Sequence, residues 1–200
     1  MVAADIPSIA HLHELGFPGL FLTSLGYAFL CELYSAILTD ISSFAFVAVC
    51  EANNCRFVAG TTQLSGFYGR LIRRRAWRFA FAAMPVITQR PSISLYLLRA
   101  FLPPRQVTHR NRCGTLMPLA MHPDKPRNGI DTSLVRVFLQ EASMKGLEFV
   151  ELATNQLNNK GANRFYQEIG FMCERSYLTS RRRLMNKYVF DLSILSSTPD

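Results

Sequence analysis

The chain has 200 residues, of which 49% are hydrophobic and 18% are charged. This length suits one domain that buries about 70% of the surface of its unfolded form, and the apolar content excludes intrinsic disorder. No apolar run reaches the roughly 18 residues of a membrane-spanning helix, and residues 1–9 lack the pattern of a signal peptide. Five cysteines without a C-x-x-C pair predict reduced thiols and no metal site. Together these features predict a cytoplasmic protein.

The net charge of +8 is concentrated in one stretch of the chain. Residues 64–112 contain ten arginines and no acidic residue, so this stretch carries +10 and the rest of the chain −2. Apolar residues lie between the arginines, which is typical of amphipathic helices. So strong a local charge predicts an anionic partner.

Hydrophobic spacing predicts the elements of one domain over residues 1–200, with a helical, arginine-rich insertion at about 64–112. In chain order these are a helix at 7–15, a helix at about 21–38, strands at 44–50 and 56–62, two amphipathic helices that separate near 85–91, a strand at 115–121, a helix at 130–145, a strand at 147–154, a helix at 160–169, and strands at 171–179 and 184–192. The strand–loop–helix–strand run over 115–154 is a βαβ unit, whose two strands should be parallel.

The loop at 125–132 leads into the helix at 130–145 and contains one glycine, Gly129. Unpaired amide groups and the helix dipole make such a helix start favourable for an anion. The loop fits neither a Walker loop nor the dinucleotide G-x-G-x-x-G pattern. Many helices start after a glycine-bearing loop, so this feature by itself indicates little.

Residues 119–171 resemble the acyl-CoA-binding half of the GNAT N-acetyltransferases, most specifically over NNKGANRFYQEIGF at 158–171. Residues 9–37 resemble the opening helices of that superfamily, and residues 46–62 its central hairpin. The resemblance implies an α/β (α+β) fold with a central mixed, mostly antiparallel sheet, a parallel βαβ cofactor-binding unit and helices on both faces. It also implies acetyl-CoA as co-substrate, without a metal.

The resemblance also implies which residues bind the cofactor. Leu119 and Met121, on either side of Ala120, would hydrogen-bond the pantetheine arm through their backbones. Backbone amides of the loop and first helical turn would cradle the pyrophosphate, at Arg127, Asn128, Gly129, Ile130, Asp131 and Thr132.

The most specific segment implies three further roles. Asn159 falls where the family has an asparagine that contacts the cofactor arm, and Ala162 where a small residue lets the cofactor pass. Tyr166 matches the tyrosine that protonates the departing thiolate, as a phenol beside the sulfur can do when charge develops there. Without the resemblance, Tyr166 could be a core aromatic residue and Asn159 a helix-cap residue.

The loop departs from the family pattern, Gln/Arg-x-x-Gly-x-Gly/Ala, at two positions. Pro126 stands first and removes a backbone donor, and Asp131 stands last. A carboxylate about 5 Å from a phosphate costs roughly 3 kcal/mol at an effective dielectric near 20. Arg127 and Lys125 could offset this repulsion, or Asp131 could turn away and serve the helix start.

Two further departures concern strands. The strand at 115–121 lacks the acid that many family members place at its start, so the base that accepts the amine proton is open among His109, Glu32, Glu51 and a water chain. Only Val2–Asp5 remain for the family's first strand, which should be short or absent.

Three interpretations of the arginine-rich insertion remain open. Its helices could cap the substrate groove with solvated arginines. The arginines could instead line the groove and bind an anionic acceptor, such as a nucleotide-linked or acidic amino sugar. Or the helices could lie on an anionic membrane, with Trp77, Phe79 and Phe81 buried in it. Nucleic acid is not expected, because no reader motif accompanies the charge.

The sequence therefore predicts an N-acyltransferase that moves acetyl from acetyl-CoA to a primary amine of a small molecule, by direct attack in a ternary complex. The alternative is a non-catalytic GNAT-like module whose CoA loop is degraded by Pro126 and Asp131, and which binds an anionic membrane or a partner. Neither the acceptor nor the oligomeric state follows from the sequence.

Overall fold

The computed structural model describes residues 1–50, 53–89, 110–117, 120–121, 129–157, 159–179 and 182–196. Within them, one sheet contains β1 (Ser43–Cys50), β2 (Asn53–Thr61), β3 (Cys113–Leu116), β4 (Ala120–Met121), β5 (Phe149–Asn155), β6 (Met172–Leu178) and β7 (Leu184–Asp191). The strand order is β1-β2-β3-β5-β7-β6, and β4 also pairs with β2. Only β3 and β5 pair in parallel, which confirms the predicted mixed sheet and its βαβ unit.

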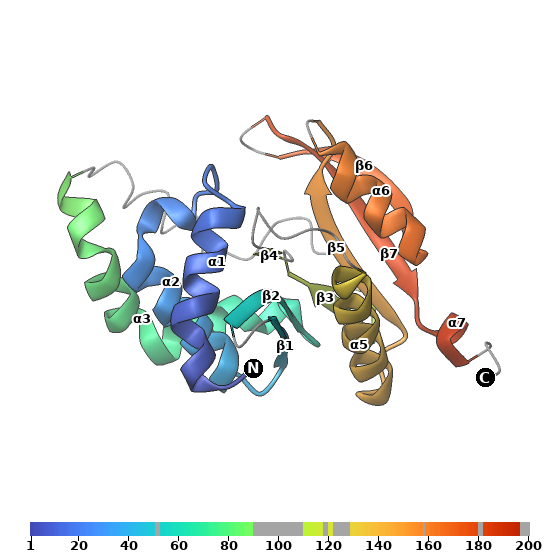
Figure 1. The fold of residues 1–200 in the computed structure, drawn as a ribbon, viewed down its shortest axis with the longest axis horizontal. Coiled ribbons are helices and arrows are strands. Elements are labelled where there is room, and N and C mark those ends of the chain that lie inside the picture. The colour runs from blue at the N-terminus through green and yellow to red at the C-terminus, as the bar shows by residue number, and fades with distance from the viewer. Residues whose placement is uncertain are drawn as a thin grey trace.

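The helices are α1 (Ile6–Gly16), α2 (Tyr27–Thr39), α3 (Leu64–Gln89), α5 (Ile130–Met144), α6 (Lys160–Ile169) and the short α7 (Ser193–Ser196), with 3-10 turns at Ala3–Asp5 and Thr23–Leu25. In Figure 1, α1, α2 and α3 gather on one side of the view, and α5 and α6 lie on the other. The helix expected at about 21–38 begins only at Tyr27, because Gly26, with a φ of 90°, interrupts the chain after the second 3-10 turn. Residues 1–42 contain no strand, in line with the expected loss of the first one.

Alternation along β2 sends its side chains into two separate cores. Phe57 packs with α1, α2 and α3, whereas Val58 packs with α5 and the C-terminal strands. Arg56 shares the parity of Val58, so its side chain points to the α5 side of the sheet. Phe138 of α5 lies directly on β2 at Gly60, where any Cβ would collide with its ring. This close approach fixes α5 against β2.

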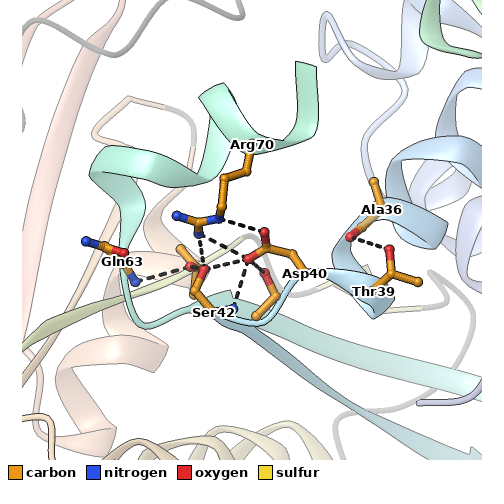
Figure 2. A network of polar contacts seen from close by, with 8 residues as sticks. Ala36, Thr39, Asp40, Ser42, Gln63 and Arg70 are labelled. Atoms are coloured by element: carbon orange, nitrogen blue, oxygen red, sulfur yellow. Dashed lines mark hydrogen bonds and ion pairs between the residues drawn. The ribbon is translucent and has the colours of Figure 1, made fainter. Parts of the chain in front are cut away.

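Helix α3 is fastened to the turn between α2 and β1 by Arg70, Asp40 and Ser42 (Figure 2). Arg70 Nε donates to Asp40 Oδ2 at 2.8 Å, and the Ser42 hydroxyl donates to Asp40 Oδ1 at 2.6 Å. Arg70 Nη2 donates to Asp40 Oδ1 and to the Ser42 hydroxyl. Burial would raise the pKa of Asp40, but these hydrogen bonds outweigh burial and hold the pKa at about 2. The first arginine of the basic stretch therefore stabilises the fold.

The bend in α3 lies at Arg75, where φ is −139° and ψ is 18°. The helix continues through Pro85 and ends at Gln89, within the range 85–91 expected for the separation, and residues 90–91 lie outside the described residues. At the bend, Arg75 donates to Glu32 at 2.7 Å and to Ser35 at 2.8 Å, both on α2. The second expected amphipathic helix lies outside the described residues. Among the helices that are described, none is both long enough and apolar enough to cross a membrane.

Candidate functional site

The parallel strands β3 and β5 separate after three paired positions. Their pairing runs from Cys113 opposite Phe149 to Thr115 opposite Glu151. Beyond these three pairs, β5 continues along β7, whereas the chain after β3 continues along β2 as β4. Between the pairs Phe57–Ala120 and Gly60–Leu116, β2 advances three residues, whereas the chain from β3 to β4 advances four. The expected strand at 115–121 is therefore described as two strands, β3 and β4, and residues 118–119 lie outside the described residues.

A cavity of about 850 Å³ opens where these strands separate. Its walls come from the end of α1 and the loop after it, from the ends of β3 and β5, from α6, and from the turn that leads into β7. Three of the predicted site residues, Asn159, Ala162 and Tyr166, line this cavity together. A volume of this size suits a small-molecule site.

Tyr166 packs as a core aromatic residue and also borders the cavity. Its ring packs in an aromatic cluster, with its centroid 5.2 Å from that of Phe165 and 5.6 Å from that of Phe171. The side chain is 7% exposed and borders the cavity. The core packing thus fixes a phenol at the wall of the opening between the strands.

Asn159 precedes α6 at its N-cap position, but its side chain makes no cap hydrogen bond. It donates instead to Thr154 Oγ1 of β5 at 2.5 Å. Asn163, one turn further on, donates to the backbone carbonyls of Asn155 and Asn159 and accepts from Tyr188 Oη at 3.0 Å. These contacts hold the start of α6 against β5 and β7. The sequence analysis did not identify Asn163, although it lies within the motif.

The start of α5 has the form expected of an anion site. Gly129 is its N-cap residue, with a φ of 75° that favours glycine, and open space surrounds the position of a Cβ there. No side chain caps this end, and the first amides of a helix have no partner within it. Ile130 packs partly into the core below, and Thr132 is half-buried. None of these residues lines the 850 Å³ cavity.

Asp131 points into the protein, away from the helix start. Its carboxylate Oδ1 lies 2.5 Å from Nε of Arg56, and the two side chains are 5% and 1% exposed. Arg56 lies opposite Met121 of β4 in the sheet. The ion pair therefore joins the start of α5 to β2, next to β4, whose backbone is expected to bind the pantetheine arm. The structure shows an arrangement that the sequence analysis did not consider, in which Asp131 pairs with Arg56 instead of serving the helix start. Lys125 and Arg127 lie outside the described residues. Arg56 neutralises the charge of Asp131, and the sequence analysis missed this pair because the two residues lie 75 positions apart.

Other predicted site residues are only partly described. Ala120 and Met121 form β4, whereas Leu119, Arg127 and Asn128 lie outside the described residues.

Of the candidate bases, His109 and Glu51 also lie outside the described part of the chain. Glu32 is paired with Arg75 and does not line the cavity, so the structure gives it no contact with the site.

The described arginines of the basic stretch lie away from the cavity. Arg70, Arg75 and Arg78 pair with acidic residues of α2 or the turn after it, and none of them borders the cavity. Two other arginines, Arg182 and Arg183 in the turn before β7, do line it. In the sequence this turn can be recognised only as basic. The pairing of β5 with β7 places it at the cavity.

The sequence model of the acetyltransferase (GNAT) family matches residues 8–171, which is most of the chain. The chain belongs to the GNAT acetyltransferase family. GNAT enzymes use acetyl-CoA as the acetyl donor, and the opening between β3 and β5 with the glycine-capped start of α5 suits that elongated, anionic co-substrate. No curated protein matches the GNAT chain at the level of sequence.

Solved structures share the fold at low identity. An aminoglycoside 6'-N-acetyltransferase complexed with coenzyme A is 12% identical, with a TM-score of 0.63 over 98% of this chain and 94% of that chain. A variant of spermidine N-acetyltransferase from Vibrio cholerae is 14% identical, with a TM-score of 0.61 over 96% and 93%. An N-acetyltransferase of ribosomal-protein alanine from Escherichia coli is 13% identical, with a TM-score of 0.58 over 96% and 90%. The GNAT fold thus extends over nearly the whole chain.

Proposed function

We propose that this GNAT protein transfers acetyl from acetyl-CoA to a primary amine of a small molecule, by direct attack in a ternary complex. One observation carries the proposal: Tyr166, Asn159 and Ala162 line a single cavity where β3 and β5 separate. The paired Asp131 supports it further, because Arg56 neutralises one of the two features, Pro126 and Asp131, that favoured a degraded CoA loop.

The chemistry divides among groups of this chain. The neutral amine nitrogen attacks the thioester carbonyl, a C–N bond forms, and the C–S bond breaks. Tyr166 donates its hydroxyl proton to the departing thiolate, and the amine proton leaves through water, since no carboxylate among the described residues lines the cavity. Backbone amides along the separating strand would polarise the carbonyl.

Binding and turnover test the proposal separately. Titration with acetyl-CoA should raise the melting temperature, and an amine panel should release free thiol in an acetyl-CoA-dependent reaction. A flat thermal response at millimolar acetyl-CoA would contradict the proposal and favour the non-catalytic module. Acetyl-CoA binding without turnover on any amine would leave a binding role only.

A second candidate function concerns the outer face of α3. Trp77 and Phe81 are 62% and 65% exposed, and Met84 continues the same helical stripe. Arg73 and Arg74 are exposed one turn before it, and the Arg78 guanidinium lies 5.4 Å from the Trp77 ring centroid. Exposed aromatic side chains beside arginines support peripheral contact of a cytoplasmic protein with an anionic membrane.

Trp77 is the only tryptophan in the chain, so its fluorescence reports on this stripe directly. Vesicles that contain phosphatidylglycerol should shift its emission to the blue, and pure phosphatidylcholine vesicles should shift it less. Phe81→Ser and Arg73→Gln should weaken the shift, whereas Arg164→Gln, an exposed α6 arginine, serves as control. An identical emission spectrum with and without anionic vesicles would exclude the membrane role.

A further inference from the structure

The charge of the cavity wall has one sign. Among the described residues that line it, the charged ones are Lys160, Arg182 and Arg183, and none is acidic. Neither arginine of this pair has an acidic partner in an ion pair of the described chain; Arg183 Nη2 donates to the neutral amide oxygen of Asn155 at 2.7 Å. Their positive charge is therefore left for a ligand.

The turn that carries these arginines is held in place by its own hydrogen bonds. The amide of Arg182 donates to the carbonyl of Thr179 at 2.9 Å, and the amide of Thr179 donates to the carbonyl of Arg183 at 2.9 Å. Arg182 has a φ of 55°, an uncommon conformation for a residue with a side chain. These hydrogen bonds join Arg182 and Arg183 to Thr179, and the guanidinium group of arginine binds carboxylate and phosphate well.

Apolar residues also line the cavity. Phe17 and Leu20, in the loop after α1, line the cavity, and Leu157 after β5 adds a third apolar side chain. The loop is fixed by Thr23, whose hydroxyl donates to the carbonyl of Phe17 at 2.6 Å. An acceptor in this cavity therefore meets both apolar side chains and guanidinium groups.

We infer that the acceptor amine is attached to an apolar body that also carries a carboxylate or phosphate, and that Arg182 and Arg183 select for that anionic group. This inference rests on the proposed acetyl transfer and names its substrate class. Polycationic amines are disfavoured, since cations in the wall repel them and no described carboxylate attracts them. The selectivity thus differs from that of the spermidine and aminoglycoside enzymes that share the fold, whose names give cationic acceptors. An anionic acceptor was one of the three interpretations left open for the insertion, and this inference assigns its binding to the turn before β7 instead.

Three amines with one body provide the test: tyramine, tyrosine with a carboxylate beside the amine, and O-phosphotyramine with a phosphate at the far end. Spermidine is the polycationic comparison. The quantity measured is the ratio of kcat/KM for each anionic amine to that for tyramine, in wild type, Arg182→Gln, Arg183→Gln and the control Arg164→Gln. Comparing ratios between variants removes differences in the intrinsic reactivity of the amines.

At least one anionic amine should be preferred in wild type, and its ratio to tyramine should fall about tenfold in Arg183→Gln or Arg182→Gln but not in Arg164→Gln. Which of tyrosine and O-phosphotyramine responds identifies the group that is bound. Preference for spermidine, or ratios unchanged by both arginine variants, would overturn the inference while acetyl transfer stood. A raised KM for acetyl-CoA with unchanged ratios would assign the arginines to the co-substrate and also overturn it. If acetyl-CoA neither binds nor reacts, the proposed function itself fails.

Discussion

Replacing Arg56 by methionine would leave the Asp131 carboxylate buried at the start of α5 without its counter-charge. The two charged atoms lie 2.5 Å apart, and both side chains are almost completely buried. At that separation an effective dielectric of about 20 gives a gross attraction of roughly 7 kcal/mol, most of which offsets the cost of burying both charges. Removing Arg56 leaves the Asp131 carboxylate buried without this counter-charge, so Arg56→Met should lower the free energy of unfolding by about 3–5 kcal/mol. Asp131→Asn removes the other half of the same ion pair and should also lower the free energy of unfolding.

The same two substitutions should have opposite effects on acetyl-CoA. In Arg56→Met the buried carboxylate loses its counter-charge and should weaken acetyl-CoA binding. A carboxylate that faced a diphosphate at about 5 Å would cost roughly 3 kcal/mol, or about a hundredfold in Kd, and this is the upper limit because Asp131 points inward. In Asp131→Asn the remaining guanidinium attracts the diphosphate, so the Kd should stay equal or fall. The double variant with Arg56→Met and Asp131→Leu carries no net charge at this point, and it should regain both stability and affinity.

Urea unfolding measures the stability of all three variants, and calorimetric titration with acetyl-CoA measures the Kd. The double variant keeps the test decisive if a single variant fails to fold. Equal loss of affinity in both single variants would show that the pair only shapes the loop. Full affinity in Arg56→Met would show that Asp131 does not face the diphosphate.

Three further predictions follow from the geometry. Tyr166→Phe should lower kcat about a hundredfold or more and change the Kd of acetyl-CoA little, as steady-state kinetics and titration would show. An unchanged kcat across pH would exclude the acid role. The pKa of Asp40 is about 2 in the folded protein, below its unfolded value, so on the order of 1 kcal/mol of the free energy of unfolding should be present above pH 4 and lost as the pH falls toward 2. In Arg70→Met this loss between pH 4 and 2 should disappear. Burial lowers the pKa of His13 to about 4, so about 3 kcal/mol of the free energy of unfolding should be lost as the pH falls from 6.5 to 4. His13→Asn should make the free energy of unfolding less dependent on pH in that range, and an unaltered pH dependence would contradict the assignment.

Short-range pattern was enough to predict the C-terminal half of the molecule. The periodicity of residues 130–145 and 160–169 defines two helices whose bounds agree with α5 and α6 within one residue, because each has its own apolar stripe and a glycine at its end. The strand–helix–strand order over 115–154 was sufficient to predict the parallel pair. Asn159, Ala162 and Tyr166 lie within eight residues of one another, so a local motif could place them at one site.

Charge pairing was decided only by the tertiary structure. Whether Asp131 repels a phosphate depends on Arg56, which lies on a strand far away in the sequence and reaches α5 only because β2 alternates its side chains between two cores. A ligand site was one interpretation of the arginines in the basic stretch, but Arg75 and Arg78 form ion pairs with Glu32 because α3 packs against α2. Arg182 and Arg183 face the cavity because β5 and β7 pair along their length and carry the turn to its edge. A sequence shows which charges exist, but the energy of a charge depends on distance and burial, and only the folded chain sets those.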